Sequence, residues 1–223
     1  MSSHDIEILS TYSPVLLFDR KEPFLPVKVG YTIFEESGKS PSTPLFVALT
    51  DEEKYAIEYA IYWDYDIQHL YELEHVWIYV GKDDNVSRVK ASWHGIYNEF
   101  PNDILKFDSK HVYLYSQPGK HAFSPVVDTF FHFPGVIESC SVLAGTEGLL
   151  LTSVFQGVYQ KSALKDYLAR KYLEKFAFIP SLEFDKEYRF SEDMFVRWEE
   201  LYEWIPKRIK ECLYNIFDEL IKL

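Results

Sequence analysis

Residues 69–80 read HLYELEHVWIYV, and this stretch decides how the rest of the chain is interpreted. Its second half alternates large apolar side chains, as buried strands do. Successive side chains of a strand point to opposite faces, so Glu72 and Glu74 share a face with the valines and isoleucine of 76–80. That aliphatic run must point into the core. Two carboxylates, about 7 Å apart along the strand, are therefore predicted at the edge of a hydrophobic core.

Ionised carboxylates at a core edge are unfavourable unless they are protonated, paired with a base or bound to a cation. No lysine or arginine lies between residues 55 and 81, so a basic partner must come from elsewhere in the chain. A divalent cation would neutralise both charges directly. The alternative is a charged strand end in water, with single histidines hydrogen-bonded to backbone groups. We adopt that simpler interpretation for His75 and His111, which do not share the face of the glutamates.

Further candidate ligands surround this strand in the sequence. Asp66 ends the preceding apolar segment, and His69 follows it. His94 in SWHG and His121 in GKHAF occur where strand ends or turns are expected. Carboxylate and imidazole groups together bind divalent cations, although their spacing is less diagnostic than that of cysteine–histidine motifs. The residues thus leave a metal site and a solvated strand end as alternatives.

Composition favours one folded domain. The chain has 223 residues, 47% of them hydrophobic and 17% aromatic, which is enough apolar material for a sizeable core. Aromatic residues are favoured in strands. We expect a single domain over residues 1–223, with a sandwich core at about 10–160 and a helical extension at about 161–223.

Net charge and cysteine content limit which binding partners and which cellular compartment are expected. The net charge is −12, from 35 acidic and 23 basic residues, so phosphate backbones are repelled and nucleic acid is excluded as a partner. No signal peptide and no membrane-spanning segment is expected. Two cysteines, Cys140 and Cys212, do not make a disulfide framework and are expected as buried thiols. The expected location is the cytoplasm.

Five apolar segments with turn residues between them predict the main strands. Tyr55, Ile57, Tyr59, Ile61 and Trp63 alternate with small or polar residues. The prolines of 12–34 suggest short edge strands, and 35–44 is expected as a surface loop. The spacing predicts a mainly antiparallel β-sandwich. Its strands are expected at 54–63, 73–80, 86–93, 111–116 and 149–159.

The last third of the chain has helical periodicity, which makes the fold class α+β. Apolar residues recur at helical spacing over 161–176 and 206–222. Ser191, with Glu192 and Asp193 in the following turn, is expected to cap a helix. Pro206 then either kinks that helix or opens a second one. We expect these helices to cover one sheet face, with a partner-binding helix as the alternative.

Several short segments resemble, in the same order, those of two known families. QHLYELEH (68–75) resembles the GHRHDWEH region of the necrosis- and ethylene-inducing-like proteins and the HxGDWEH segment of a vacuolar-protein-sorting-associated family. SWHG (92–95) and HVYLYSQPGKHAFSP (111–125) resemble later segments of these families. YWDYD (62–66) and YSPVLLFDRKEPFLP (12–26) resemble earlier ones. Together the segments span residues 12–125, a little over half of the chain.

The resemblance implies a β-sandwich that holds a divalent cation at one end. Matched position by position, the ligands would be Asp66, His69, Glu72 and Glu74. His94 and His121 match later histidines that would line the same cavity. The chain departs from the family pattern at Gln68, Tyr71, Leu73 and Glu72, where the families have glycine, histidine, tryptophan and aspartate. The toxin branch is secreted and disulfide-bonded, and this sequence shows neither sign. We therefore do not carry over membrane lysis and lipid-headgroup recognition.

Two functions fit these expectations. In a metal-dependent hydrolase, Mg²⁺, Mn²⁺, Ca²⁺ or Zn²⁺ would polarise a carbonyl or phosphoryl oxygen, and His94 or His121 would move the proton. No GxSxG, HExxH, Walker or GxGxxG motif offers another chemistry. The alternative is a non-catalytic binding module for a polar ligand such as a headgroup or sugar. Its aromatic wall would be made by Trp63, Tyr65, Tyr71, Trp93 and Tyr97, although for most of these residues we favour a role in the core of so aromatic a chain.

Overall fold

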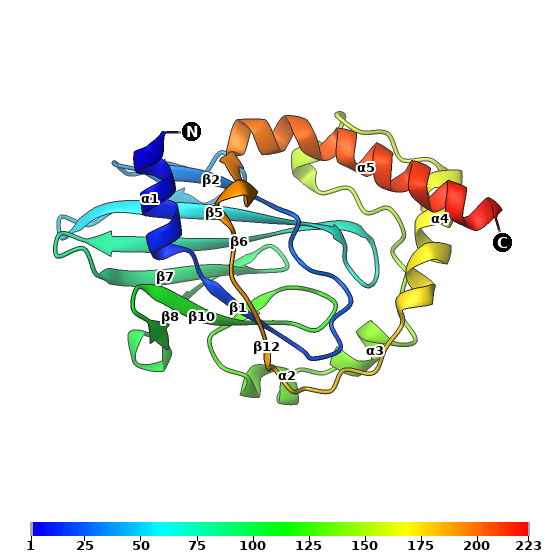
Figure 1. The fold of residues 1–223 in the computed structure, drawn as a ribbon, viewed down its shortest axis with the longest axis horizontal. Helices are drawn as coiled ribbons and strands as arrows, with labels where there is room; N and C mark the ends of the chain where they lie inside the picture. Colours follow the sequence, from blue (N-terminus) through cyan, green and yellow to red (C-terminus); the bar gives the residue numbers. More distant parts are fainter. Residues whose placement is uncertain (1, 223) are drawn as a thin grey trace.

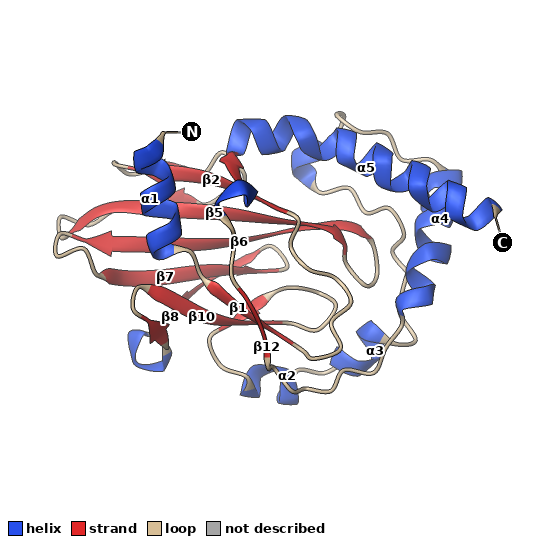
Figure 2. Cartoon of the chain, viewed as in Figure 1, coloured by secondary structure: helices blue, strands red, loops and turns tan. Residues whose placement is uncertain are grey.

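The computed structural model describes residues 2–222, apart from the side chains of Ser153 and Ile221, and has an α+β fold (Figure 1). Strands fill the left and centre of Figure 2, and most of the helices lie along its top, right and lower edges. The larger sheet is antiparallel except for the parallel pair β13–β2. Its strand order is β13 (Phe195–Arg197), β2 (Lys28–Phe34), β5 (Glu53–Tyr65), β6 (Leu70–Gly81), β7 (Val86–Trp93) and β8 (Ile96–Phe100).

A second sheet faces the first across a hydrophobic core. Its order is β11 (Phe123–Ser124), β10 (His111–Ser116), β1 (Val15–Phe18) and β12 (Lys186–Tyr188), and β9 (Phe107–Asp108) also pairs with β10. Within it, β1 and β10 are parallel. The strands predicted at 54–63, 73–80, 86–93 and 111–116 are confirmed as β5, β6, β7 and β10.

Strand alternation explains how the two layers meet. Tyr55, Ile57, Tyr59, Ile61 and Trp63 of β5 point into the core between the sheets, as the sequence predicts. The aliphatic side chains at positions 76, 78 and 80 of β6 join them. Burial of each large side chain contributes about 1.5–3 kcal/mol to stability. Because the side-chain period of a strand is two, Glu72 and Glu74 lie on the same inward face.

The C-terminal helices cover the opposite face of the larger sheet. Helix α4 (Ala163–Leu173) begins after Ser162, whose side chain accepts a hydrogen bond from Lys165 N, and a 3-10 turn, Glu174–Phe176, follows it. Helix α5 (Trp198–Ile221) packs against β2 and β5. The residues between helices and sheet form a second apolar cluster that includes Tyr62 and Ile205. The expected coverage of a sheet face is thus observed for α5 over β2 and β5, whereas α4 packs mainly against α5.

Two predictions for the second half of the chain are wrong. Residues 149–159 form no strand; the segment contains a 3-10 turn, Ser153–Phe155, and buries Leu149 and Phe155 beneath α5 instead of pairing. Ser191 begins only a 3-10 turn, Glu192–Met194, because the chain then enters β13 before α5 starts. Pro206 lies inside α5 and does not open a second helix.

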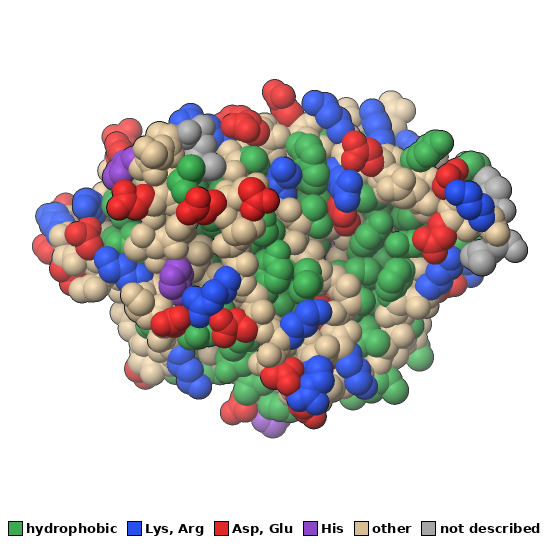
Figure 3. Space-filling model, in the orientation of Figure 1, with side chains coloured by type: hydrophobic (Ala, Val, Ile, Leu, Met, Phe, Trp, Pro, Cys, Tyr) green, Lys and Arg blue, Asp and Glu red, His purple; other side chains and the backbone are tan. Residues whose placement is uncertain are grey.

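The remaining elements are short or peripheral. Helix α1 (Ser3–Tyr12), not expected from the sequence, begins with a capping box between Ser2 and Asp5. The predicted loop at 35–44 carries β3 (Gly38–Lys39), which pairs with β4 (Phe46–Val47). The others are a 3-10 turn, Asn102–Ile104, and helices α2 (Asp128–His132) and α3 (Val136–Cys140). Among the described helices, none has the length and apolarity needed to cross a membrane. Charged side chains of both signs are interspersed on the face seen in Figure 3.

The contact between β2 and α5 gives a first testable prediction. A Cβ added to Gly30 would lie 2.7 Å from Leu201 Cδ2 and 3.3 Å from Trp198 Cε3. We expect Gly30→Ala to lower the free energy of unfolding by about 1–3 kcal/mol, since a methyl group has no space in this packed layer. Urea unfolding measures the change. Gly38→Ala is the control, because its nearest neighbour would be Phe34 at 3.8 Å. Equal effects of both substitutions would contradict the proposed close packing.

Candidate metal centre

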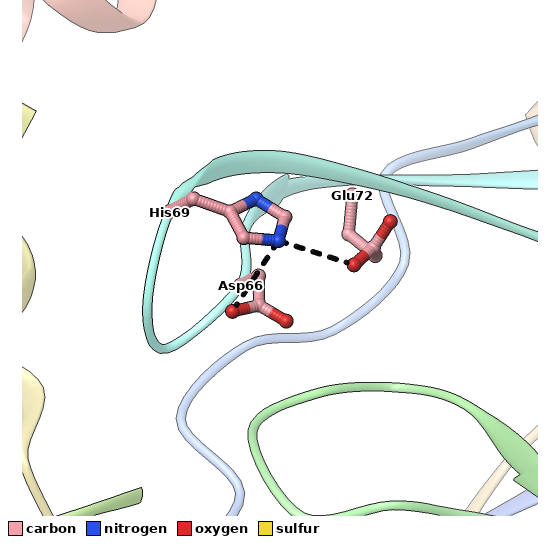
Figure 4. A group of neighbouring side chains, drawn as sticks. All are labelled: Asp66, His69 and Glu72. Carbon is pink, nitrogen blue, oxygen red and sulfur yellow. Dashed lines mark ion pairs between the residues drawn. The ribbon is translucent and has the colours of Figure 1, made fainter. Parts of the chain in front are cut away.

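A tight turn between β5 and β6 brings three candidate ligands together. Asp66 N donates to His69 O at 3.0 Å, and Gln68 N donates to Asp66 Oδ1 at 2.7 Å. The turn directs Asp66, His69 and Glu72 toward one another (Figure 4). His69 Nε2 lies 3.7 Å from Asp66 Oδ1 and 3.5 Å from Glu72 Oε2. The ligand atoms of the three side chains all lie within 4.8 Å of each other.

The hydrogen bonding of His69 fixes which nitrogen faces the carboxylates. Nδ1 lies 2.8 Å from Tyr71 O, and since a carbonyl can only accept, Nδ1 carries the hydrogen. Tyr71 has φ +55°, in the left-handed region that residues other than glycine rarely adopt. In the neutral ring, Nε2 therefore presents a lone pair to Asp66 and Glu72. A lone pair among anionic oxygens is the arrangement of a histidine that ligates a metal.

A lysine that sequence reasoning missed enters this group. Lys120 Nζ lies 2.8 Å from Asp66 Oδ1, and its side chain is largely buried. The turn between β10 and β11 brings it in, with Gly119 O accepting from Ile67 N at 2.8 Å. Asp66 thus has the basic partner from elsewhere in the chain that the sequence left open, and the expectation of a positive charge other than lysine or arginine as its sole neutraliser is wrong for this residue. The GK dipeptide at 119–120 was visible in the sequence, but only the packing of its turn brings it beside the acids.

One ammonium does not balance the buried acids. Asp66, Glu72 and Glu74 are all buried, and Lys120 is the one lysine or arginine paired with any of them among the described residues. With neutral histidines, an excess of two negative charges remains. Burial and the neighbouring Glu74 raise the pKa of Glu72 well above its ordinary value, and burial also raises the pKa of Glu74. Burial by itself would raise the pKa of Asp66, but the ammonium of Lys120, which donates to its Oδ1, holds that pKa below the usual range.

The donor atoms fit a divalent cation. Asp66 Oδ2 is buried and has no hydrogen-bond partner, which is unfavourable unless something polar or positive lies beside it. His69 Nε2 and Glu72 Oε2, which lie 3.5 Å apart, are the candidate ligand atoms of the other two residues. Two carboxylates and one imidazole are a ligand set typical of Zn²⁺ or Mn²⁺. The double positive charge of such an ion would balance the two negative charges that remain after Lys120 is counted against the three buried acids.

Glu74 and His94 form a second pair beside the first group. With Glu72 they also make a second candidate metal group, whose ligand atoms lie within 4.8 Å of one another, as the predicted ligand role of Glu74 requires. Glu74 accepts hydrogen bonds from Ser92 Oγ and from His94 N, the latter at 3.3 Å. His94 Nε2 lies 2.9 Å from Gln117 Oε1 and therefore donates, which leaves Nδ1 3.7 Å from Glu74 Oε1. The two-residue turn between β7 and β8 places the ring, since His94 and Gly95 both have positive φ. This pair can hold or pass a proton.

Residues of the Asp66–His69–Glu72 group and of the Glu74–His94 pair line one cavity of about 520 Å³. This volume is typical of small-molecule sites. The lining includes His69, Glu72, Glu74, His94 and Lys120. Sequence reasoning did not single out several other lining residues, which come from distant segments: Ser42, Thr43, Glu147 and Thr152. Single hydroxyl and carboxyl residues in loops carry no pattern that would reveal them.

His121 lies outside this cavity. It is fully buried, its ring is stacked on Trp63 with centroids 4.7 Å apart, and Nε2 lies 3.3 Å from Glu22 Oε1. Its Nδ1 has no hydrogen-bond partner. The structure thus brings together Asp66, His69, Glu72, Glu74 and His94, but it does not bring His121 to the cavity lining. The proton-transfer role expected for His121 stays a prediction.

The expected aromatic wall is largely absent. Of the five aromatic residues proposed for it, Tyr97 lines the cavity, whereas Trp63 and Tyr71 are buried in the two apolar clusters. Trp93 stacks on Phe130 with centroids 5.8 Å apart. His111 Nδ1 lies 2.8 Å from Ser13 O, in keeping with the simple interpretation of that residue.

His75 gives a prediction of pH dependence. It is buried beside Ser42 Oγ at 2.9 Å, and burial lowers its pKa to about 3 from an ordinary value of 6.5. Above pH 6.5 neither state is protonated, and the full stability is present. As pH falls from 6.5 toward 3, the His75 imidazole binds a proton in the unfolded chain but stays neutral in the folded protein. We expect this residue to lower the unfolding free energy by up to about 1.4 kcal/mol per pH unit in that window.

Urea unfolding at several pH values between 4 and 7 measures this effect. In His75→Gln the slope of unfolding free energy against pH should decrease by up to the amount that one bound proton contributes. His4→Gln, on the exposed surface of α1, should retain the wild-type slope. An unchanged slope in His75→Gln would contradict a buried neutral imidazole.

Comparison with known proteins identifies two similar solved structures. One is NLPPya in complex with glucosamine, with 17% identity and a TM-score of 0.35, covering 53% of this chain and 64% of that chain. The other is a substituted form of NLPPya, with 17% identity, a TM-score of 0.34 and the same coverage. NLPPya is a necrosis- and ethylene-inducing-like protein. The chain thus matches slightly less than two thirds of these structures, and similarity at this level does not assign it to the family.

No family model matches the chain, and no curated protein matches it. The resemblance to the vacuolar-protein-sorting-associated family therefore stays a prediction.

Proposed function

We propose that Asp66, His69 and Glu72 bind one divalent cation on the wall of the cavity, and that the protein is a metal-dependent hydrolase of a small polar substrate. The observation that carries the proposal is the convergence of carboxylate oxygens of Asp66 and Glu72 on the lone pair of His69 Nε2. An excess of negative charge remains there, and Asp66 Oδ2 is buried without a hydrogen-bond partner. Zn²⁺ or Mn²⁺ suits these donors better than Ca²⁺, which prefers oxygen ligands alone.

Three protein ligands favour catalysis over a purely structural ion, because catalytic sites keep a coordination position open to substrate or water. A bound divalent cation polarises a carbonyl or phosphoryl oxygen and lowers the pKa of water. Glu74 and His94, which line the same cavity, would take the proton of the attacking water and return it to the leaving group. Ser92 and Gln117 hold these two side chains in place through their hydrogen bonds.

The non-catalytic binding module is the weaker alternative. An aromatic wall would favour it, and Tyr97 alone of the five expected aromatic residues lines the cavity in the described part of the chain. The cytoplasmic location expected from the sequence stays a prediction.

Metal analysis of the purified protein tests the proposal. We expect one ion per chain and loss of thermal stability with chelator, recovered by adding Zn²⁺ or Mn²⁺. A cation at 100 times its dissociation constant stabilises the folded state by about 2.7 kcal/mol, which corresponds to roughly 5–10 °C in melting temperature for a chain of this length. Protein that contains no ion, takes up none and melts unchanged with chelator would contradict the metal site.

A hydrolysis screen with ester, phosphate and peptide substrates tests catalysis. Glu74→Gln should retain the ion and lose about 10²–10⁴-fold in turnover, since it removes a proton acceptor and not a ligand of the proposed ion. Full activity of this variant would exclude Glu74 from the reaction.

A further inference from the structure

The cavity lies along an unpaired stretch of strand edge. Strand β6 pairs with β5 over nearly its whole length, from Leu70 to Gly81. Its pairing with β7 covers only Val76 to Val80. Residues 71–75 therefore pair with a strand on one side only. On the other side Ser92 of β7 meets His75 through its side chain, and Leu73 and His75 line the cavity.

The backbone polar groups of Leu73 point to that open side. Leu73 is the Cα partner of Tyr62 on β5, and Tyr62 O accepts from Val27 N at 2.8 Å, toward β2. Since the N–H and C=O of one strand residue point to the same side, Tyr62 and Leu73 form a non-hydrogen-bonded pair. The N–H and C=O of Leu73 therefore face away from β5. Leu73 N donates instead to its neighbour's side chain, Glu72 Oε1, at 2.8 Å.

Side chains occupy this edge where a strand would normally pair. His75 N donates to Ser92 Oγ at 2.6 Å, and Leu73 N donates to Glu72. A side-chain acceptor at a strand edge is exchangeable, because a peptide carbonyl satisfies the same donor. Addition of an extended segment to a sheet edge is a common mode of peptide recognition.

The charge of the cavity selects among possible occupants. Glu74 and Glu147 line it, and the ammonium of Lys120 is already paired with Asp66. Glu147 is 45% exposed at its side chain and lies 3.8 Å from both His69 Nε2 and Lys120 Nζ. With the proposed cation balancing Asp66, Glu72 and Glu74, the charge of Glu147 remains on this wall and disfavours anionic substrates. A neutral backbone with a basic side chain is complementary to it.

We propose that the substrate is an extended peptide that pairs with Leu73 at the open edge of β6 and places a lysine or arginine side chain beside Glu147. This inference rests on the proposed hydrolase function. The paired peptide lies next to both the Asp66–His69–Glu72 group and the Glu74–His94 pair. The oxygen of water bonds to the peptide carbonyl carbon, the C–N bond breaks, and the water proton passes through Glu74 and His94 to the leaving nitrogen. The products are a carboxylate and an amine.

Blocked hexapeptides of alanine with one central lysine are the probes, compared with the same peptides carrying central glutamate. Two readouts are used: cleavage by metal-loaded protein, and hydrogen-exchange protection of residues 71–75 by the peptides with and without chelator. We expect the lysine peptide to be cleaved at least 10-fold more efficiently. N-methylation of the peptide nitrogen that pairs with Leu73 should lower kcat/KM about 10-fold, as loss of one hydrogen bond predicts, whereas N-methylation of the adjacent nitrogen should have little effect.

Glu147→Gln should reduce the preference for lysine over glutamate about 10-fold, while Glu138→Gln, an exposed acid on α3, should leave it unchanged. Metal-bound protein that hydrolyses p-nitrophenyl acetate or phosphate, but neither cleaves the peptides nor gains protection at 71–75, would overturn the peptide assignment and leave the hydrolase standing. Protein that binds no metal but is protected at 71–75 by the lysine peptide would overturn the hydrolase and retain the docking edge.

Discussion

Replacing Glu72 with glutamine is expected to weaken divalent-cation binding by at least about 100-fold while making the metal-free protein more stable. The two effects have opposite signs because Glu72 is a buried acid among other acids. Glutamine keeps the acceptor for Leu73 N and can donate to the lone pair of His69 Nε2, 3.5 Å from the present carboxylate oxygen. We expect a gain of about 1–3 kcal/mol in the free energy of unfolding at pH 8 in chelator.

The sign of the pH dependence provides a second check on Glu72. Its folded pKa is raised above the ordinary value of 4.5, so the folded metal-free protein binds the proton more tightly than the unfolded chain does. The resulting stability is present below pH 4.5 and is lost as pH rises through the folded pKa. Metal-free Glu72→Gln should lack this loss.

Urea unfolding at pH 5 and pH 8, with and without Zn²⁺, separates these effects. Glu147→Gln is the matched control, since its side chain is 45% exposed and should alter the stability of the metal-free protein little. Tight metal binding by Glu72→Gln would contradict the role of Glu72 as a metal ligand. Lower stability of the metal-free variant would contradict the idea that the charge of Glu72 destabilises the metal-free protein.

Replacing Lys120 with methionine is expected to destabilise the metal-free protein by about 3–5 kcal/mol, because it leaves the buried Asp66 without its partner. Burial alone would lower the pKa of Lys120, but Asp66 and Glu72 outweigh it and raise that pKa, so the ammonium stays charged. A saturating divalent cation should recover part of the loss, since it neutralises the same carboxylates.

A double-mutant cycle measures the pair directly. Asp66→Asn combined with Lys120→Met should be more stable than Lys120→Met alone, because no unpaired buried charge remains. Lys171→Met, which removes an exposed pair with Glu174, should leave the melting temperature nearly unchanged. A Lys120→Met protein as stable as the wild type would show that Asp66 is neutralised by some other means.

Local patterns predicted those parts of the fold in which each residue's environment follows from its neighbours in sequence. The alternation in 54–63 and 73–80 correctly indicated the strands and their inward faces, including the shared face of Glu72 and Glu74. The helical periodicity of 161–176 likewise matched α4. The apolar residues of 149–159 suggested a strand but are buried beneath α5 without pairing, which no local pattern distinguishes.

The candidate site likewise contains some residues whose proximity was predictable from the sequence and others that only tertiary packing brings in. Asp66, His69 and Glu72 belong to one turn and one strand, so their proximity follows from short-range geometry and was predictable. Lys120 and Glu147 reach the site from turns more than 50 residues further along the chain. His121 adjoins Lys120 in sequence, yet its ring is stacked on Trp63 while the ammonium reaches Asp66.

The sequence by itself determined the two-layer α+β architecture and the presence of acids at a core edge, because a strand's side-chain period assigns faces without reference to the rest of the protein. Only the tertiary structure decided how those acids are neutralised, which histidine faces the cavity, and that β7 leaves the edge of β6 open beside them. These features depend on packing between distant segments. Burial, which sets the strength of charge interactions, exists only once that packing has formed.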